Sequence, residues 1–360
     1  MRRWLICLAL CLWAVTLPVR AEELPSELWK ALPGAAEKAL GDIDLFGEDP
    51  LGEGAAGLWE QVKGQAGAVF RRQMKGAVLV LLTALLCGMA EGVQQGAGGE
   101  GTGLPVMVGA LAVTLLTVGS MDSLMGLGAG TIREMGTFSK ALLPTLAAAT
   151  AAAGALTTAT AQQITTVFVV DVLQQLIREL LLPMAYLYVG LLAAGAMLAD
   201  NRLGAFAAAL KKCVSWLLSV PTVAFTVYLS MAGVIRGSVD GMRVRVVKSA
   251  ISGAIPVVGG ILADVSETVL AGAGMLKGAI GVFGMLGVLS ICAAPFLHLG
   301  MQYLLYKLAA LLAGVLAPTP LTRLIDGLAG AFGLVLGMTG ACAVLLLVSI
   351  LSSVAAVVPW

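Results

Sequence analysis

Apolar stretches follow one another along most of this chain, separated by short segments rich in glycine or charged residues. Each stretch approaches the roughly 20 apolar residues that a helix needs to cross a bilayer. The pattern therefore predicts a polytopic membrane protein with about six to eight transmembrane helices. The candidate spans are residues 76–92, 104–121, 141–160, 183–199, 214–235, 279–297, 300–317 and 328–351.

The segments between these stretches predict helices of a second kind. The chain lacks the alternating segments of about ten residues that mark a membrane β-barrel, so the expected fold is all-α. Residues 169–183 place polar side chains near one helical face and leucines on the other. The polar residues are Asp171, Gln174, Gln175, Arg178 and Glu179. We therefore expect amphipathic or re-entrant helices among the transmembrane ones.

The N-terminus has the layout of a secretory leader. Arg2 and Arg3 precede an apolar run, and the small residues Val19 and Ala21 form a plausible cleavage site. We therefore predict a signal peptide at residues 1–21, with a retained anchor helix as the alternative. In both cases the following segment begins outside the cytoplasm.

A polar stretch separates this leader from the first apolar span. We interpret residues 22–72 as an extracytoplasmic arm and residues 73–355 as a multi-span membrane domain. The arm contains Gly52, Gly54 and Gly57 at the GxGxxG spacing of dinucleotide-binding folds. That motif requires a preceding β-strand, whereas an acidic, turn-rich segment precedes it here, so we expect no nucleotide site.

Basic residues give conflicting indications of orientation. The richest basic segment contains Arg236, Arg243, Arg245 and Lys248. The positive-inside rule predicts that this segment is cytoplasmic. However, Arg71, Arg72 and Lys75 precede the first span on the side that the leader marks as external. A surface helix over residues 57–75, with its basic side chains at lipid head groups, would reconcile the two.

Composition argues against several classes of function. The formal net charge is only +1, so we expect no nucleic-acid binding. The six cysteines show no CxxC spacing, and the lone His298 cannot complete an ordinary zinc site or an HExxH motif. GxSxG is also absent. We therefore predict no enzymatic activity, no metal and no cofactor.

Glycines recur at helical spacing in the C-terminal third of the chain. Small residues at such positions let membrane helices approach closely. The candidate helix-packing glycines are Gly274, Gly278, Gly281 and Gly284, continued by Gly287, and Gly333 and Gly337 in the last span. A helix with this smooth face would either pack on a neighbour or border a passage.

Two carboxylates interrupt the apolar pattern within residues 255–269, which read IPVVGGILADVSETV. On a helix Asp264, Glu267 and Thr268 share one face, which makes them a candidate polar membrane face. Nothing nearby suggests a substrate pocket, so a catalytic pair is disfavoured. A re-entrant or surface helix with a wet face and the lining of a conduit remain as alternatives.

Several of these segments resemble one known family. Residues 238–284 with IPVVGG and the following D-x-x-x-T, residues 306–318, SMDSL at 120–124 and residues 138–160 all match it. On these segments the chain resembles the stage III sporulation protein AE family of endospore-forming bacteria. No catalytic residues are established for that family, so none are carried over.

The resemblance implies a role in the mother-cell-derived membrane around the forespore. The family belongs to an assembly between mother cell and forespore whose other members are a secretion-type ATPase, ring-forming proteins and small membrane subunits. Stage II sporulation protein Q joins from the forespore side. The resemblance therefore implies a channel component, either a permease or export platform, or alternatively a scaffold for the rings and the ATPase. Water exposure of Asp264 and Glu267 would favour the first.

Overall fold

The computed structural model describes residues 24–41, 43–47, 49–96, 103–153, 156–198, 201–254 and 259–355. Every regular element among these residues is a helix, which confirms the all-α prediction. The elements are α2 (Ser26–Lys30), α3 (Gly34–Leu40), α4 (Pro50–Gly96), α5 (Leu104–Ala152), α6 (Leu156–Leu176), the π-helical turn η1 (Ile177–Leu181), α7 (Leu182–Leu198), α8 (Asn201–Ala254), α9 (Gly259–Leu316) and α10 (Thr319–Ala355).

Within the described residues, six helical segments are long and apolar enough to cross a membrane. This agrees with the lower end of the predicted range. The eight apolar stretches become fewer helices because pairs of them lie on one continuous helix. Residues 104–121 and 141–152 belong to α5, and residues 279–297 and 300–316 belong to α9. At about 1.5 Å per residue, α5 rises roughly 74 Å, more than twice the hydrocarbon thickness of a bilayer.

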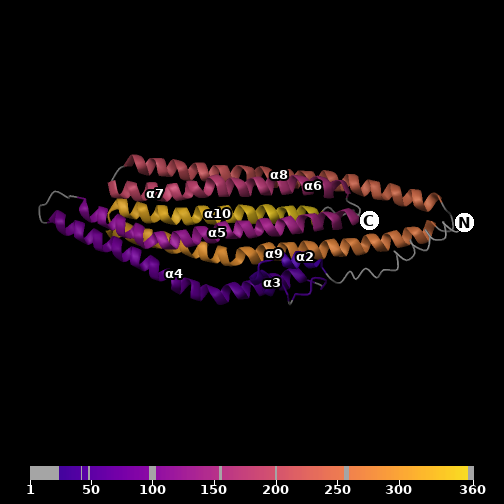
Figure 1. Cartoon of the computed structure of the whole chain (residues 1–360), viewed down its shortest axis with the longest axis horizontal. Helices are drawn as coiled ribbons and strands as arrows, with labels where there is room; N and C mark the ends of the chain where they lie inside the picture. The colour runs from indigo at the N-terminus through magenta and orange to yellow at the C-terminus, as the bar shows by residue number, and fades with distance from the viewer. Residues whose placement is uncertain are drawn as a thin grey trace.

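The long helices lie side by side along one axis and alternate in direction (Figure 1). α5 and α10 occupy the middle of this view, α6, α7 and α8 lie on one side, and α4 and α9 on the other. α9 contacts α10, α4 and α5, so it also belongs to the inner part of the bundle. In α9 and α10, 56% of the most apolar window is buried, against 17% in α4 and α8.

Prolines inside two of the helices are accommodated by the residue that follows each. Pro144 in α5 lacks a backbone N–H, and Thr145 donates its hydroxyl to the carbonyl of Ala141 at 2.9 Å. Thr222 follows Pro221 in α8 and makes the equivalent bond at 2.7 Å. Such bonds help to satisfy the backbone around a proline within an apolar environment.

The first part of the predicted arm packs on the bundle. Leu28 in α2 and Leu40 in α3 are fully buried. Trp29 meets Phe283 of α9 edge-on, with ring centroids 4.9 Å apart. The rest of the arm is joined to the first candidate span by one helix, because α4 continues without a break past residue 72.

Candidate functional site

Exposed apolar side chains gather on one half of the bundle's length. We call this the lipid half: residues 76–96 of α4, 104–121 of α5 and 300–316 of α9, at the left of Figure 1. Its large exposed apolar residues are Val78, Leu79, Leu82, Leu86, Met89, Val93, Leu104, Met107, Val108, Leu111, Leu115, Leu116, Val118, Leu304, Leu308, Leu311, Leu312, Val315 and Leu316. Residues 76–96 rise about 30 Å, which matches the hydrocarbon thickness of a bilayer.

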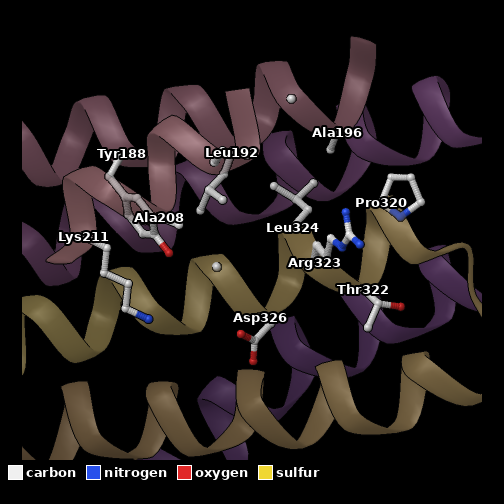
Figure 2. A pocket seen from close by; sticks show the side chains of 14 residues that line it. Tyr188, Leu192, Ala196, Ala208, Lys211, Pro320, Thr322, Arg323, Leu324 and Asp326 are labelled. Carbon is white, nitrogen blue, oxygen red and sulfur yellow. The ribbon is translucent and has the colours of Figure 1, made fainter. Parts of the chain in front are cut away.

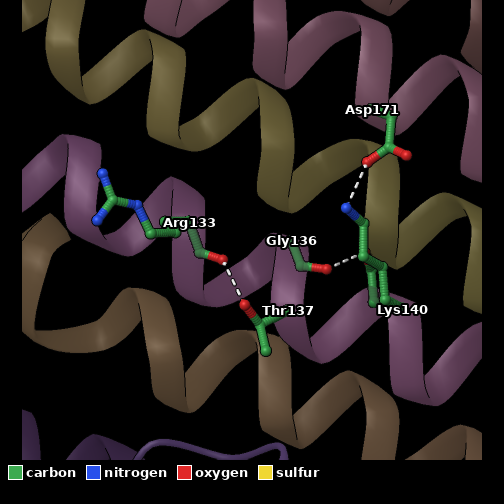
Figure 3. Close-up of polar contacts among 6 residues, drawn as sticks. Arg133, Gly136, Thr137, Lys140 and Asp171 are labelled. Atoms are coloured by element: carbon green, nitrogen blue, oxygen red, sulfur yellow. Dashed lines mark hydrogen bonds and ion pairs between the residues drawn. The ribbon is translucent and has the colours of Figure 1, made fainter.

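Farther along the axis, exposed charged side chains occur on α4, α5 and α6 beside exposed apolar ones such as Trp59 and Phe168. We call this the polar half: residues 50–75 of α4, 122–152 of α5 and 168–181 of α6 and η1. Its exposed charged residues include Glu60, Lys63, Arg71, Arg72, Arg133, Glu134, Lys140, Arg178 and Glu179. Lys140 of α5 forms an ion pair with Asp171 of α6, Nζ to Oδ1 at 3.2 Å (Figure 3). Such a surface suits water or partner proteins.

Helix α8 departs from this division. Its exposed Trp216, Val220, Val223 and Val227 recur at three- and four-residue spacing, so they form one stripe along the helix. Figure 1 shows α8 running along one edge of the bundle. α8 therefore presents an apolar stripe on the outer surface of the bundle.

The predicted amphipathic helix at residues 169–183 has a buried and an exposed face, but Gln174 is buried and Val172 and Leu180 are exposed. Ile177 and Leu181 are buried, and Arg178 and Glu179 are exposed. Gln174, which was expected on the polar face, is instead buried against Gly136 of α5. The absence of a side chain on Gly136 makes room for this amide, because any Cβ there would overlap Gln174.

The candidate packing glycines of α9 differ along the helix. A Cβ on Gly284 would lie 2.7 Å from Leu142 Cδ2, and one on Gly287 would lie 2.5 Å from Phe138 Cζ. Gly281 is similarly close to Val354. Gly274 and Gly278, in contrast, have no neighbouring heavy atom within 4 Å of a Cβ position. The close approach of α9 to α5 and α10 therefore begins at Gly281.

The two glycines of the last span have looser neighbours. A Cβ on Gly333 would lie 3.2 Å from the ring of Tyr303, which would have to move by a few tenths of an ångström. On Gly337 it would make an ordinary contact, 3.6 Å from Leu218. Gly337 thus lies at the contact between α10 and α8 without requiring the absence of a side chain.

The candidate polar membrane face lies largely outside the described part of the structure. Asp264, Glu267 and Thr268 belong to the first turns of α9, but their side chains are not among those described, and residues 255–258 are outside the described residues. The basic segment at residues 236–248, which follows the candidate span 214–235 in the sequence, is part of the same helix, because α8 continues to Ala254.

The arm and the basic segment lie toward the same end of the bundle. In Figure 1 α2, α3 and the last turns of α8 are all on the side of the polar half. If the bilayer surrounds the lipid half, an external arm and a cytoplasmic segment 236–248 would place one end of the bundle on both sides of the membrane.

A pocket of about 630 Å³ lies between α7, α8 and α10 (Figure 2). We call it the α7–α8–α10 pocket. It is lined by Tyr188, Leu192, Gly195, Ala196, Gly204, Ala205, Ala208, Lys211, Pro320, Thr322, Arg323, Leu324, Asp326 and Gly327. Its volume falls in the range of ordinary ligand sites. Pro320 is in the first turn of α10 and Ala196 in the last turn of α7, so the pocket begins near the end of the bundle.

Charged groups of both signs line this pocket. Lys211 and Arg323 contribute positive charge, and Asp326 is the negative residue of the lining. Asp326 forms an ion pair with Lys307 of α9, Oδ1 to Nζ at 2.5 Å. The Asp326 carboxylate is thus paired with a lysine that does not line the pocket.

Sequence reasoning missed these ion pairs and the pocket. One signal was available, because Lys307 falls within a predicted span and ionisable residues at membrane depth tend to have a function or a partner. The pairing with Asp326 and the convergence of three helices depend on tertiary structure. Among the described residues no three His, Cys, Asp or Glu side chains are grouped to hold a metal ion.

Comparison with known proteins identifies relatives over most of this architecture. A family model described as stage III sporulation protein AE matches residues 53–357. The stage III sporulation protein AE of Bacillus subtilis (strain 168) is 24% identical over 216 residues, which cover 60% of this chain and 54% of that protein. The aligned part thus spans little more than half of that relative. No solved structure shows a significant match.

Proposed function

Because this chain belongs to the stage III sporulation protein AE family and so has a role in sporulation, we propose that it is the polytopic membrane component of a mother cell–forespore channel assembly. In this proposal the chain acts as an export platform or permease subunit. The lipid half anchors it in the mother-cell-derived membrane, and the polar half meets the other stage III sporulation proteins. The proposal includes no catalytic step.

The observation that carries this proposal is the division of α4 and α5 into an apolar and a charged surface. The apolar part of α4 alone is long enough to cross the bilayer, and α4 continues well beyond it with Lys63, Arg71 and Arg72 exposed. A protein that served only as a membrane anchor would not require the part of α4 that extends beyond its apolar residues. A charged helical extension that continues from a transmembrane helix is instead suited to the attachment of ring-forming proteins.

The packing of the inner helices supports a conduit between subunits more than one through a single chain. Phe138 of α5, Phe283 of α9 and Phe332 of α10 are fully buried between these helices. They fill the space that a passage along the bundle axis would need. In the proposed channel, several copies or partners therefore surround the path, and the apolar stripe of α8 provides a surface for their contact.

The orientation of the chain in the membrane follows if the predicted signal peptide is given priority over the positive-inside rule. The arm and the polar half then lie between the two membranes, and the opposite end lies in the mother-cell cytoplasm. Six crossings starting outside return the C-terminus to the outside, which agrees with α10 ending on the side of the arm (Figure 1). The basic residues Arg202, Lys211 and Arg323 are then near the cytoplasmic end.

Site-specific photo-crosslinking in sporulating cells tests the proposal. A photo-reactive amino acid at position 178, in the polar half, should capture a ring-forming stage III protein. The same amino acid at position 86, in the lipid half, is the matched control and should not capture it. Capture at neither position, with normal protein level and normal sporulation, would contradict a platform role.

The alternative function is a scaffold that anchors the rings and the ATPase without forming a conduit. The filled interior of the bundle favours this alternative if the chain stays monomeric in the assembly. Purified protein in vesicles, with and without its partners, separates the two functions by release of a small fluorescent dye. Partner binding without any release from the complete assembly would favour the scaffold.

A further inference from the structure

The ion pair between α9 and α10 lies at the depth of exposed apolar side chains. Lys307 is nine residues before the end of α9, and Asp326 is seven residues after the start of α10. The exposed Leu304, Leu308 and Leu311 flank Lys307 on the same helix. At about 1.5 Å per residue, the pair is roughly 10–14 Å from the ends of the two helices, within the lipid half.

This ion pair is only partly covered by protein. The side chains of Lys307 and Asp326 are 36% and 51% exposed. Charged groups against lipid tails are costly, so at membrane depth they face polar partners or a water-filled cavity. Asp326 lines the α7–α8–α10 pocket. Water in this pocket would therefore remove much of the cost of placing the carboxylate at that depth.

The pocket extends farther from the end of the bundle than the ion pair does. The Lys211 ammonium and the Tyr188 hydroxyl lie 2.7 and 3.1 Å from the position that a Cβ on Gly330 would take. Lys211 is ten residues after the start of α8, Tyr188 is ten residues before the end of α7, and Gly330 is eleven residues after the start of α10. All three helices thus place this floor of the pocket about 15–17 Å from their ends, which is half of a hydrocarbon layer of about 30 Å.

The pocket has the room and the polar groups that water requires. One buried water needs only about 10–15 Å³ and about three polar partners, whereas this pocket has a volume of about 630 Å³. Tyr188, Lys211, Thr322 and Asp326 provide polar atoms in its lining (Figure 2). Much of the remaining lining consists of small residues, namely Gly195, Ala196, Gly204, Ala205, Ala208 and Gly327. Dry cavities are lined by apolar groups, so a lining of this kind favours water.

We propose that the α7–α8–α10 pocket is a water-filled vestibule, open at one face of the membrane and ending at Tyr188 and Lys211 about halfway through the bilayer. It admits water and small hydrophilic solutes to that depth, so that only about 15 Å of hydrocarbon separates them from the other face. The vestibule goes beyond the proposed function and does not require that the chain export anything. Either proposal can therefore fail without the other.

Two neighbouring alanines of α8 provide a matched test. Ala208 lines the pocket, whereas Ala209, at nearly the same depth, is exposed but is not part of the lining. Each is changed to cysteine in the full-length chain carrying Cys87→Ser and Cys213→Ser, in sealed phospholipid vesicles with a charged, membrane-impermeant maleimide on both faces. Because the reactive species is the thiolate, which requires water, Ala208→Cys should react at least about tenfold faster than Ala209→Cys. The chain with the two serines alone gives the baseline rate.

Two results would overturn the vestibule. Slow reaction at both positions would mean that lipid tails or protein fill the pocket. Equally fast reaction at both would mean that the bilayer does not surround this end of α8. If Ala208→Cys does not fold, Ala205→Cys and Phe206→Cys form a second pair with the same expected difference, because Ala205 lines the pocket and Phe206 is 58% exposed outside the lining.

Discussion

Helices α9 and α4 are both apolar enough to cross a membrane, yet they use that surface differently. More than half of the apolar window of α9 is buried against other helices, whereas less than a fifth of that of α4 is. Lipid tails are as apolar as leucine, so hydropathy does not distinguish a lipid-facing helix from an inner one. What distinguishes α9 is steric: glycines and aromatic rings that match α5 and α10.

The largest effect is expected where an inner aromatic ring is removed. Phe332 of α10 is fully buried and packs edge-on against Tyr306 of α9, with centroids 5.3 Å apart. Phe332→Ala should lower the free energy of unfolding by about 3–5 kcal/mol, because it leaves a cavity between two inner helices. Unfolding in mixed micelles by increasing dodecyl sulfate measures this loss. A loss below about 1 kcal/mol would mean that the α9–α10 contact is not a rigid core.

A smaller effect is expected from added bulk on the glycine face of α9. Gly284→Leu would insert a side chain between Leu142 and Ile350 and should lower the free energy of unfolding by about 1–3 kcal/mol. Gly278→Leu is the matched control on the same helix. It meets no heavy atom within 4 Å at Cβ and should stay within about 0.5 kcal/mol. If the two variants lost the same free energy of unfolding, the close contact of Gly284 with Leu142 and Ile350 would not be what makes glycine necessary on this face of α9.

The sequence predicted the membrane class from the length of its apolar stretches, but it did not predict how they join. Residues 122–140 fall between the candidate spans 104–121 and 141–160, and they contain Asp122, Arg133 and Lys140. The same segment places buried residues at three- and four-residue spacing, namely Met125, Gly128, Ile132, Met135 and Ser139. The three- and four-residue spacing of the apolar and small residues, more than the presence of charged residues, indicates that a helix continues beyond its apolar span.

The docking of the arm carried a similar signal. Leu28, Leu32, Ala36 and Leu40 recur every fourth residue across α2 and α3 and are all buried. The average composition of residues 22–72 is polar, and it obscures the spacing of these four residues.

The sequence contained no comparable signal for the α7–α8–α10 pocket, because its lining comes from three helices whose proximity depends on the complete bundle.

A still smaller effect is expected in the polar half. The Lys140–Asp171 pair joins α5 and α6, but its side chains are 61% and 48% exposed. Exposed ion pairs contribute about 0.2–1 kcal/mol and are screened by salt. A double-mutant cycle with Lys140→Gln and Asp171→Asn should give a coupling in this range that falls as the salt concentration rises. A coupling above about 2 kcal/mol would mean that this surface is shielded from water.

The smallest effect is expected on the outer face of the lipid half, where Leu86 of α4 is 65% exposed. Lipid surrounds this side chain in the folded bundle and also when the helices are inserted but separated, so Leu86→Ala removes contacts present in both states. The free energy of unfolding should therefore change by less than about 0.5 kcal/mol. Leu346→Ala on α10 removes the same atoms from a position that is 1% exposed, and it should lower that free energy by about 2–5 kcal/mol. Similar losses in the two variants would show that α4 is covered by protein at Leu86, and the outer helix would then have to be counted with the inner ones.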